Sequence, residues 1–522
     1  MANHYLIYFK KLKFIVPIVI FVFLFTNIHM SFAKDALKNS DRNIIDTQRF
    51  LLADSTDNTD DDLDDFFEDN TEKDNSGENT EDADDFFSDD EPGSEAGESQ
   101  NRKDELEEDL QADSDEPGYF INGDLSLKFG YRFNYDAPMS GDTDHSGLSH
   151  AKAEINLEFG TTFFEKWDFF ISRTAFYNFA YDINDQDDYA DKYLDEYESE
   201  VALKKLFIRG SLSKDIDLKV GRQIVVWGKS DNIRITDVLN PLDLREPGMT
   251  DIEDLRLPVT MTKLDYYYKN LALSAYMIHE HRSHKLPVFG SGYYYLPYAM
   301  PRDEEPSRKI ENTEYALSLA ANFSGFDISF YLADIYEDTP YLNSKNQLRY
   351  EDIYMAGVAA NKAKGNFLYK TEIGYFDGIR LSAFRTLGGL VDNLHEYSRL
   401  DYLLGVEYSG FKNASLSFEA ADRWVTDFDD NAEKSGQKEH SVQYAFRGSR
   451  TFLNEVFELS LLASLYGAKA DDGGFVRVNG AYDYTDSIVF ELGAIFYKSG
   501  SSALLYNIGE NNTIFCSVTY SF

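Results

Sequence analysis

The segment from Trp227 to Val259 places arginines among carboxylates, and these residue types could oppose positive and negative charges across a narrow passage. The candidate residues are Arg222, Trp227, Arg234, Asp237, Asn240, Asp243, Arg245 and Arg256. The segment is too long for a simple hairpin, and Asn240–Pro241 and Leu257–Pro258 punctuate it with turns. Two interpretations stay open: an inward-folded loop that narrows a pore and sets its selectivity, or a salt-bridged cap over its mouth.

Other residue patterns that could do chemistry are weaker. His279, His281 and His284 have a spacing that could hold a metal ion, but Glu280 is the one further ligand nearby, and solvated loop histidines are the favoured interpretation. The sequence contains no nucleophile elbow, phosphate-binding glycine loop or nucleotide fingerprint in a credible context. The net charge of −42 argues against nucleic acid as a partner. We therefore predict no enzyme activity, no cofactor and no metal site.

The elements that must position the charged segment are β-strands, because hydrophobicity alternates with a period of two from Tyr119 onward. About eighteen strands are expected, with sixteen as the alternative, and the even number suits a single-chain transmembrane barrel. The predicted strands cover residues 122–133, 152–161, 166–179, 199–211, 215–226, 260–269, 271–279, 312–323, 325–334, 352–361, 365–375, 400–409, 412–424, 440–449, 455–466, 472–483, 487–498 and 511–522.

The connections between these strands alternate between tight turns and long polar loops. The tight turns fall near Glu165, Lys214, Asn270, Gly325, Gly365, Lys412, Asn454 and Asp486. The long connections fall near residues 134–151, 180–198, 227–259, 280–311, 335–351, 376–399, 425–439 and 499–510. Outer-membrane barrels have short periplasmic turns and long outer loops. The pattern predicts this fold class and places every long loop outside.

The last strand ends in an aromatic residue. Counting back from the terminus, Phe522, Tyr520 and Val518 share an apolar face that alternates with a more polar one. A terminal aromatic residue on such a strand resembles the signal that the barrel assembly machinery recognises in the periplasm. Tyr520 and Phe522 are the predicted assembly signal.

Arg222 interrupts the apolar face of its predicted strand. That face is made of Ile216, Leu218, Val220, Ile224 and Val226. An arginine that faces lipid near the midplane costs about 2–4 kcal/mol. We therefore predict a bulge or parity switch that turns Arg222 into the lumen.

Composition is compatible with a membrane barrel although the mean hydropathy is only −0.44. The strands of a barrel need apolar residues at alternate positions, and its lumen and loops are polar. The chain has 36 Tyr and 40 Phe, which barrels use as girdles at both membrane interfaces. Its single cysteine, Cys516, excludes an internal disulfide.

The first 118 residues differ from the rest. Lys10, Lys11 and Lys13 precede an apolar run over residues 14–25, and Ala33 offers a cleavage site, so residues 1–33 are predicted to be a signal peptide. Residues 34–118 carry 32 Asp and Glu against seven Lys and Arg, with few large apolar residues. Such a composition predicts a disordered acidic periplasmic tail, and residues 119–522 form the barrel.

The order Gly221–Arg222–Gln223, Trp227–Gly228 and Asn240–Pro241 after an early strand resembles the outer-membrane proteins grouped as domain of unknown function 1302. Val226 and Lys229 depart from the family pattern, which often has Ser and an acidic residue there. The resemblance implies an outer-membrane partner of transport systems built around an RND-type inner-membrane exporter, with lipids or other hydrophobic molecules as cargo. It implies no catalytic residues.

The sequence therefore predicts an outer-membrane channel or transport component for hydrophobic or amphiphilic cargo, working with a periplasmic or RND-type export system. The alternatives are a general diffusion porin for small polar solutes and a non-conducting barrel that is an enzyme or binds at the surface. In each case the outer face contacts outer-membrane lipid.

Overall fold

The computed structural model describes residues 118–522, except 136–142, 165, 295, 297, 302, 308–311, 502–504 and 507. The predicted signal peptide and all of the predicted acidic tail before Gly118 lie outside the described residues.

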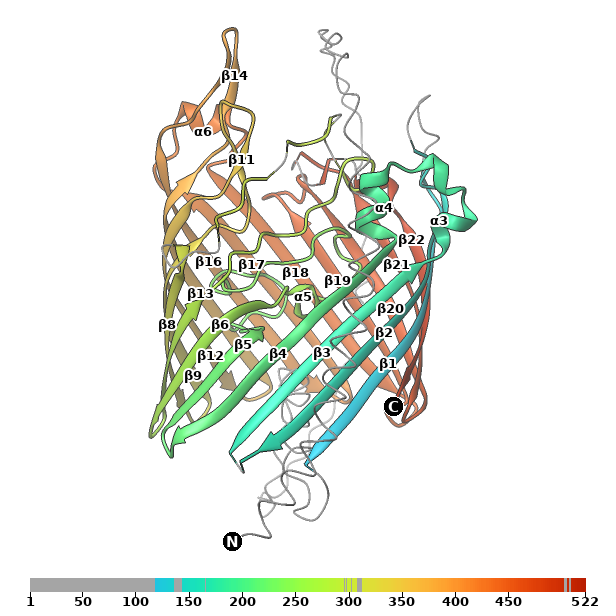
Figure 1. Cartoon of the computed structure of the whole chain (residues 1–522), viewed down its shortest axis with the longest axis vertical. Coiled ribbons are helices and arrows are strands. Elements are labelled where there is room, and N and C mark those ends of the chain that lie inside the picture. The colour runs from blue at the N-terminus through green and yellow to red at the C-terminus, as the bar shows by residue number, and fades with distance from the viewer. Residues whose placement is uncertain are drawn as a thin grey trace, which may run out of the picture. The chain divides into compact units, whose positions relative to one another are not determined.

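The described residues form a closed barrel of 18 antiparallel strands, which confirms the predicted fold class (Figure 1). The barrel closes where β1 (Tyr119–Arg132) pairs with β22 (Thr513–Ser521). The other barrel strands are β2 (Gly147–Phe163), β3 (Trp167–Asn178), β4 (Ser199–Ser213), β5 (Ile216–Gln223), β6 (Val259–Tyr268), β7 (Leu271–Ile278), β8 (Glu314–Phe323), β9 (Phe326–Tyr336), β12 (Asp352–Lys364), β13 (Phe367–Arg380), β16 (Glu396–Phe411), β17 (Ala414–Val425), β18 (His440–Phe452), β19 (Phe457–Tyr466), β20 (Gly473–Thr485) and β21 (Ile488–Lys498). Each of the eighteen overlaps one predicted strand.

The two faces of the wall differ in the way that a membrane barrel requires. In β8, Tyr315 and Leu317 are 48% and 46% exposed on the outer face, whereas Ala316 and Ser318 are buried on the inner face. Buried polar side chains recur on the inner face at Lys370, Glu372, Asp401, Glu407, Glu419, Gln443 and Arg477. The apolar side of each strand therefore faces outward, and the polar side faces the lumen.

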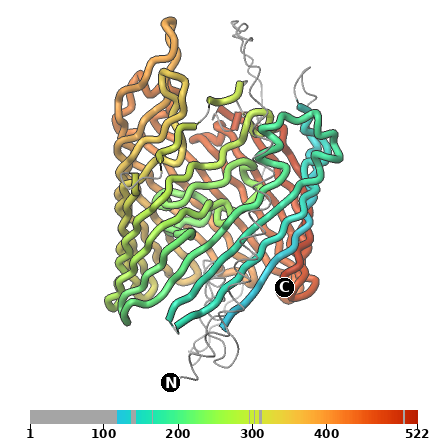
Figure 2. The backbone as a smooth tube through the Cα atoms, in the orientation of Figure 1, coloured from blue at the N-terminus to red at the C-terminus, as the bar shows by residue number. Residues whose placement is uncertain are grey.

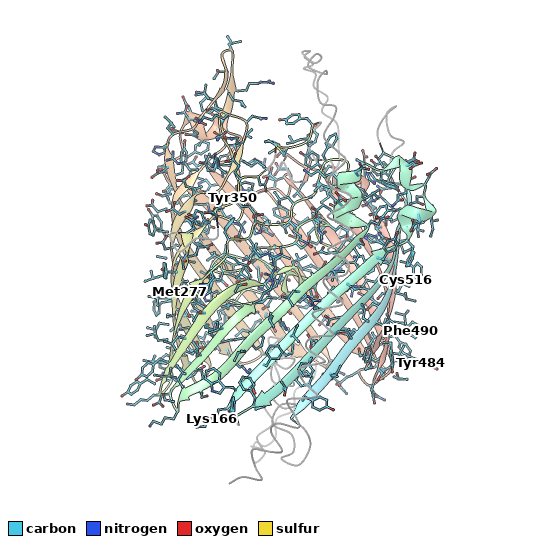
Figure 3. The ribbon with its side chains drawn as sticks, in the orientation of Figure 1. Lys166, Met277, Tyr350, Tyr484, Phe490 and Cys516 are labelled. Atoms are coloured by element: carbon cyan, nitrogen blue, oxygen red, sulfur yellow. The ribbon has the colours of Figure 1, made fainter. Side chains whose placement is uncertain are left out.

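Aromatic side chains gather near the ends of this outer face. At the short-turn end, Tyr484 and Phe490 project from the wall, and their rings are 6.0 Å apart (Figure 3). Near the opposite end, Tyr354 and Tyr375 are 58% and 44% exposed. Two aromatic belts around an apolar band are typical of barrels that span a membrane.

The connections follow the predicted alternation with one exception. Turns such as residues 214–215 and 365–366 join strands at one end of the barrel, and the long connections lie at the other end (Figure 2). The exception is the connection over residues 467–472, which is only six residues long although it lies at the long-loop end. The C-terminus lies at the short-turn end (Figure 1), as predicted from the even strand count.

Several long connections contain secondary structure that the sequence did not predict. The helical segments are α3 (Ala180–Ile183), η1 (Gln186–Asp188), α4 (Asp191–Tyr197), α5 (Ile252–Leu255), α6 (Asp430–Lys434) and η4 (Ile508–Glu510). Two small hairpins pair β10 (Tyr341–Leu342) with β11 (Leu348–Arg349) and β14 (Phe384–Thr386) with β15 (Gly389–Val391). These elements are too short to leave a periodic signal. None of the helices within the described part of the chain is long and apolar enough to cross a membrane.

The bulge predicted at Arg222 is absent, because β5 pairs with β6 in continuous register from Ile216 to Gln223. Arg222 is therefore on the same outward face as Val220, which is 42% exposed. The arginine is accommodated by ion pairing instead: its Nη1 lies 2.7 Å from Glu280 Oε1.

We predict that Phe522→Ala lowers the yield of assembled barrel several-fold. Phe522 exchanges two backbone hydrogen bonds with Gly123, and its ring is 52% exposed on the outer face. The amount of heat-modifiable, folded protein in outer-membrane fractions measures the yield. Tyr484→Ala is the matched control, because Tyr484 is an equally outward ring away from the terminus. Equal yields of the two variants would contradict the assigned assembly signal.

Candidate functional site

Residues 224–258, here called the inward loop, leave the wall after β5 and fold into the lumen. Its short helix α5 lies in the interior of the barrel in Figure 1. The loop contacts inward-facing side chains of β2, β4, β9, β13, β17, β18, β20 and β21. It therefore crosses the lumen rather than capping the mouth at one edge.

A carboxylate of β13 holds the first bend of the loop. Glu372, which is 1% exposed, accepts hydrogen bonds at Oε1 from the backbone N–H groups of Lys229 (2.6 Å) and Ser230 (2.8 Å). Its Oε2 accepts from the N–H (3.0 Å) and the hydroxyl (2.8 Å) of Thr236. Four donors converge on this one buried carboxylate, which compensates its loss of hydration.

A second carboxylate, on β17, holds the next three residues. Glu419 is also 1% exposed, and it accepts from the N–H groups of Asp231 (3.0 Å) and Asn232 (3.1 Å) and from the hydroxyl of Ser230 (2.8 Å). Lys370 of β13 pairs with the Asp231 side chain and lies 3.0 Å from Glu407 Oε2 of β16. The loop tip is thus fixed to three neighbouring strands.

Apolar packing fills the space between the loop and this part of the wall. The Trp227 ring stacks on Tyr331 of β9 with ring centroids 4.7 Å apart, and it meets Tyr276 of β7 edge-on at 5.6 Å. Ile233 and Ile235 are 1% and 2% exposed, and they pack in a cluster with Leu403, Ala421 and Ala445 on β16 to β18. This side of the lumen is a packed core.

Within the loop, Asp237 is the centre of the charge pattern seen in the sequence. Its Oδ2 lies 3.2 Å from Arg234 Nε and 2.8 Å from Arg256 Nε, and its Oδ1 accepts from the N–H of Trp227 at 3.2 Å. Asp237 and Arg256 are 5% and 6% exposed. At this burial the pairing holds the two arms of the loop together.

Asn240, which is fully buried, joins the entry and exit of the loop. Its side-chain oxygen accepts from the N–H of Val225 at 2.8 Å, and its amide donates to the Leu257 carbonyl at 2.8 Å. Arg234 also donates to the Asn240 carbonyl at 2.8 Å.

The other predicted site residues lie apart from this centre. Arg245 pairs with Asp243 at 2.5 Å and with Glu200 of β4 at 2.8 Å. Arg222 is on the outer face with Glu280, as described above. The structure therefore brings together five of the eight candidates, namely Trp227, Arg234, Asp237, Asn240 and Arg256, whereas their role in selectivity stays a prediction.

The far end of the loop reaches β18, β20 and β21. Asp251 pairs with Arg477 of β20 and lies 3.4 Å from Arg447 of β18. Arg477 also donates to the Gly248 carbonyl at 3.1 Å, and Tyr497 donates to the Pro247 carbonyl at 2.7 Å.

The inner faces of β2 to β5 carry a different surface, here called the lysine–phenylalanine face. It consists of Lys152, Lys205, Lys219, Phe170, Phe176 and Phe207. The ammonium groups of Lys152 and Lys219 lie 4.1 and 3.9 Å from the ring centroids of Phe176 and Phe207. Contacts of the inward loop with β2 and β4 lie near the long-loop ends of those strands, at His150 and Glu200.

Among the described residues, which include the three histidines of the connection after β7, no group of three or more His, Cys, Asp or Glu side chains is arranged to hold a metal ion. The interpretation as solvated residues is wrong for two of them. Burial lowers the pKa of His281 to about 4 and that of His284 to about 3. His284 Nδ1 accepts from the N–H of Leu242 at 2.8 Å, so a neutral ring helps to fix the inward loop.

The residues that the sequence analysis missed are Glu372, Glu419 and Lys370. They occupy inward positions of their strands, where a barrel carries polar residues in any case. Nothing in the local sequence distinguishes a carboxylate that binds a distant loop from one that is hydrated.

Two glycines explain part of the motif around the loop entry. Gly221 has φ +133°, and a Cβ there would lie 2.2 Å from the Leu206 carbonyl oxygen. Gly228 has φ +87°, and a Cβ there would lie 2.6 Å from Glu372 Oε1. These positions require glycine for the turn into the lumen and for the close approach of the carboxylate.

Comparison with known proteins supports the resemblance drawn from the sequence. A family model described as "Protein of unknown function (DUF1302)" matches residues 140–522. No curated protein matches the chain.

Solved structures of outer-membrane channels are similar in outline. OccD3 (OpdP) of Pseudomonas aeruginosa is 10% identical with a TM-score of 0.44, covering 78% of this chain and 91% of that one. OccK9 (OpdG) of the same organism is 11% identical with a TM-score of 0.45, covering 77% and 97%. The channel DcaP of Acinetobacter baumannii is 11% identical with a TM-score of 0.40, covering 77% and 97%. Sequence identities and TM-scores this low do not indicate a shared solute.

We predict that the double variant Glu372→Gln/Glu419→Gln releases the loop tip. Each amide keeps one acceptor oxygen and loses the charge, and each lost hydrogen bond to a charged group costs about 1–3 kcal/mol. We expect a larger single-channel conductance and faster proteolysis within residues 224–258, with the barrel still folded.

Glu491→Gln is the control. Glu491 accepts hydrogen bonds from the side chains of Asn479 and Ser517, which belong to the barrel wall and not to the inward loop. The anchoring role is refuted if the double variant conducts and resists protease as the control does.

Proposed function

We propose a function from the premise that the chain belongs to the family described as "Protein of unknown function (DUF1302)", whose model matches residues 140–522. The porin-like barrel is a channel of the outer membrane in which the inward loop leaves a narrow passage along the lysine–phenylalanine face. Its solutes are anionic molecules with an apolar part.

The observation that carries this proposal is the asymmetry of the lumen. One side is a packed core around Trp227, Ile233 and Ile235, and the other side combines ammonium groups with aromatic rings. Ammonium groups attract an anionic head, and phenylalanine rings offer contact to an apolar chain. A wall of this kind suits an amphiphilic anion better than a neutral sugar.

A general diffusion porin for small polar solutes is the second candidate. It is favoured by small polar side chains that hydrogen-bond along the inner wall, such as Ser126 with Thr519 (2.9 Å) and Thr174 with Asn156 (3.1 Å). Such a surface stays hydrated and lets water-soluble molecules pass. The loop anchored across the lumen argues for the narrower, selective passage.

Partnership with a periplasmic or RND-type export system is part of the proposal, and it is supported by the family resemblance. We predict that deleting residues 34–117 abolishes co-purification of periplasmic partners and leaves the barrel folded. Cross-linking in intact cells, followed by affinity purification, measures this. Unchanged co-purification would remove the tail from the proposal.

The selectivity of the passage is testable by charge reversal. Lys205→Glu/Lys219→Glu should lower the chloride-to-potassium permeability ratio by roughly threefold or more, because both ammonium groups lie on the passage wall. Reversal potentials in a salt gradient across planar bilayers provide the ratio. Lys345→Glu, in an exposed connection at the long-loop end, serves as the control. A permeability ratio that shifts no more than in the control would overturn the assignment of this face.

A further inference from the structure

The wall of the barrel is incompletely paired between β4 and β5. Their ladder ends at the pair Leu206 and Arg222, whereas β4 continues for seven residues to Ser199 and stays paired with β3. The short β5 beside the long β4 is visible in Figure 1. Among the described residues, β4 therefore has ladder partners on only one side from Ser199 to Lys205. An unpaired strand edge is costly where no water reaches the backbone.

Residues 199–205 of β4 and the end of β5 therefore border an interval without backbone pairing. Side chains bridge this interval. Arg222 Nε donates to the Leu203 carbonyl of β4 at 3.0 Å. On the inner side, Glu200 accepts from Arg245 at 2.8 Å and from Lys285 at 2.5 Å. Side-chain bridges of this kind can be broken singly, unlike a continuous ladder.

One outward position at this place carries an arginine, Arg222, whereas the outer face elsewhere is mostly apolar. Arg222 pairs with Glu280, which is buried, and Val201 on the outer face of β4 is 73% exposed. Glu280 also accepts from the N–H (3.0 Å) and the hydroxyl (2.8 Å) of Thr260 on β6. Ionisable residues within a membrane wall are expensive and commonly mark a functional pathway.

Glu280 also lines a small crevice. Its apolar lining comes from Val238, Leu239, Pro241, Val259 and Ile278, and its polar lining comes from Glu280, His281, Arg282, Glu314 and Asp338. Burial and the nearby charge of Arg222 lower the pKa of Arg282, and its Nη1 donates to the Pro258 carbonyl at 2.5 Å. The guanidinium groups of Arg222 and Arg282 are donors for one anionic group, and the apolar lining offers contact to an apolar chain.

We propose that the interval between β4 and β5–β7 is a lateral gate through which amphiphilic anions pass between the lumen and the membrane. The anionic group of the ligand exchanges with Glu280 on Arg222 and Arg282, and its chain follows Val201 and Leu203 into lipid. This inference rests on the proposed function for the passage that delivers the ligand to the gate.

The test closes the gate with a reversible cross-link. In a Cys516→Ser background, Leu203→Cys and Thr260→Cys are joined by a short cleavable bis-thiol reagent across the interval. In proteoliposomes, the lock should slow transfer of dodecanoate into the bilayer by roughly fivefold or more, and cleavage of the reagent should restore it. The chloride current should change little, because the cross-link connects β4 to β6 in the wall and does not span the proposed passage.

The matched control is Thr371→Cys/Leu404→Cys, an outward pair that faces across the continuous ladder of β13 and β16. Cross-linking there should leave dodecanoate transfer unchanged. Equal transfer by locked and unlocked protein would overturn the gate. If instead the proposed function is wrong, the protein without the cross-link will show no preference for anions, and this result differs from a failure of the gate alone.

A second measurement does not depend on cross-link geometry. A benzophenone amino acid at Val201 should capture radiolabelled dodecanoate, whereas the same group at Leu404, which is 67% exposed on a distant part of the wall, should not. Labelling at Val201 should also fall when the Leu203–Thr260 lock is in place. Equal capture at the two positions refutes the gate.

Discussion

Two buried carboxylates determine the interior of this barrel. Glu372 and Glu419 project from the wall into the lumen, and together they accept seven hydrogen bonds from residues 229–236. Carboxylates this deeply buried need donors, and the backbone N–H groups of a loop outside regular secondary structure need acceptors. The loop supplies the donors and the two carboxylates supply the acceptors, so these hydrogen bonds stabilise the loop inside the barrel. The packing of Trp227 against the wall follows from this arrangement.

The inward loop makes the two halves of the barrel different. Near β5 to β18 the lumen is filled, and near β2 to β5 it has a wall of lysines and phenylalanines. The strand from which the loop leaves the wall, β5, has only eight residues, because the chain turns inward after Gln223. Folding a loop inward therefore removes pairing from β4 and leaves charged residues such as Arg222 on the outer face.

The sequence was sufficient for the fold because the alternation of apolar and polar residues repeats along eighteen strands. Small errors at strand ends do not change the count. The Arg222 prediction failed because an ion pair with Glu280 accommodates the arginine without a bulge, and Glu280 is 58 residues away in sequence. The site was predicted in part. Asp237 and Asn240 act within the loop and are visible as a local pattern, whereas the loop's partners Glu372 and Glu419 belong to distant strands and leave no local signal.

Cysteine accessibility tests the divided lumen most directly. In a Cys516→Ser background, single cysteines replace Lys152, Lys219, Ala421 or Ala445, and a negatively charged thiosulfonate is added during current recording. A passage along the lysine–phenylalanine face predicts rapid block at positions 152 and 219. Positions 421 and 445, which are 3% and 1% exposed beneath the loop, should not react. Rapid block at 421 or 445, without block at 152 or 219, would contradict this division of the lumen.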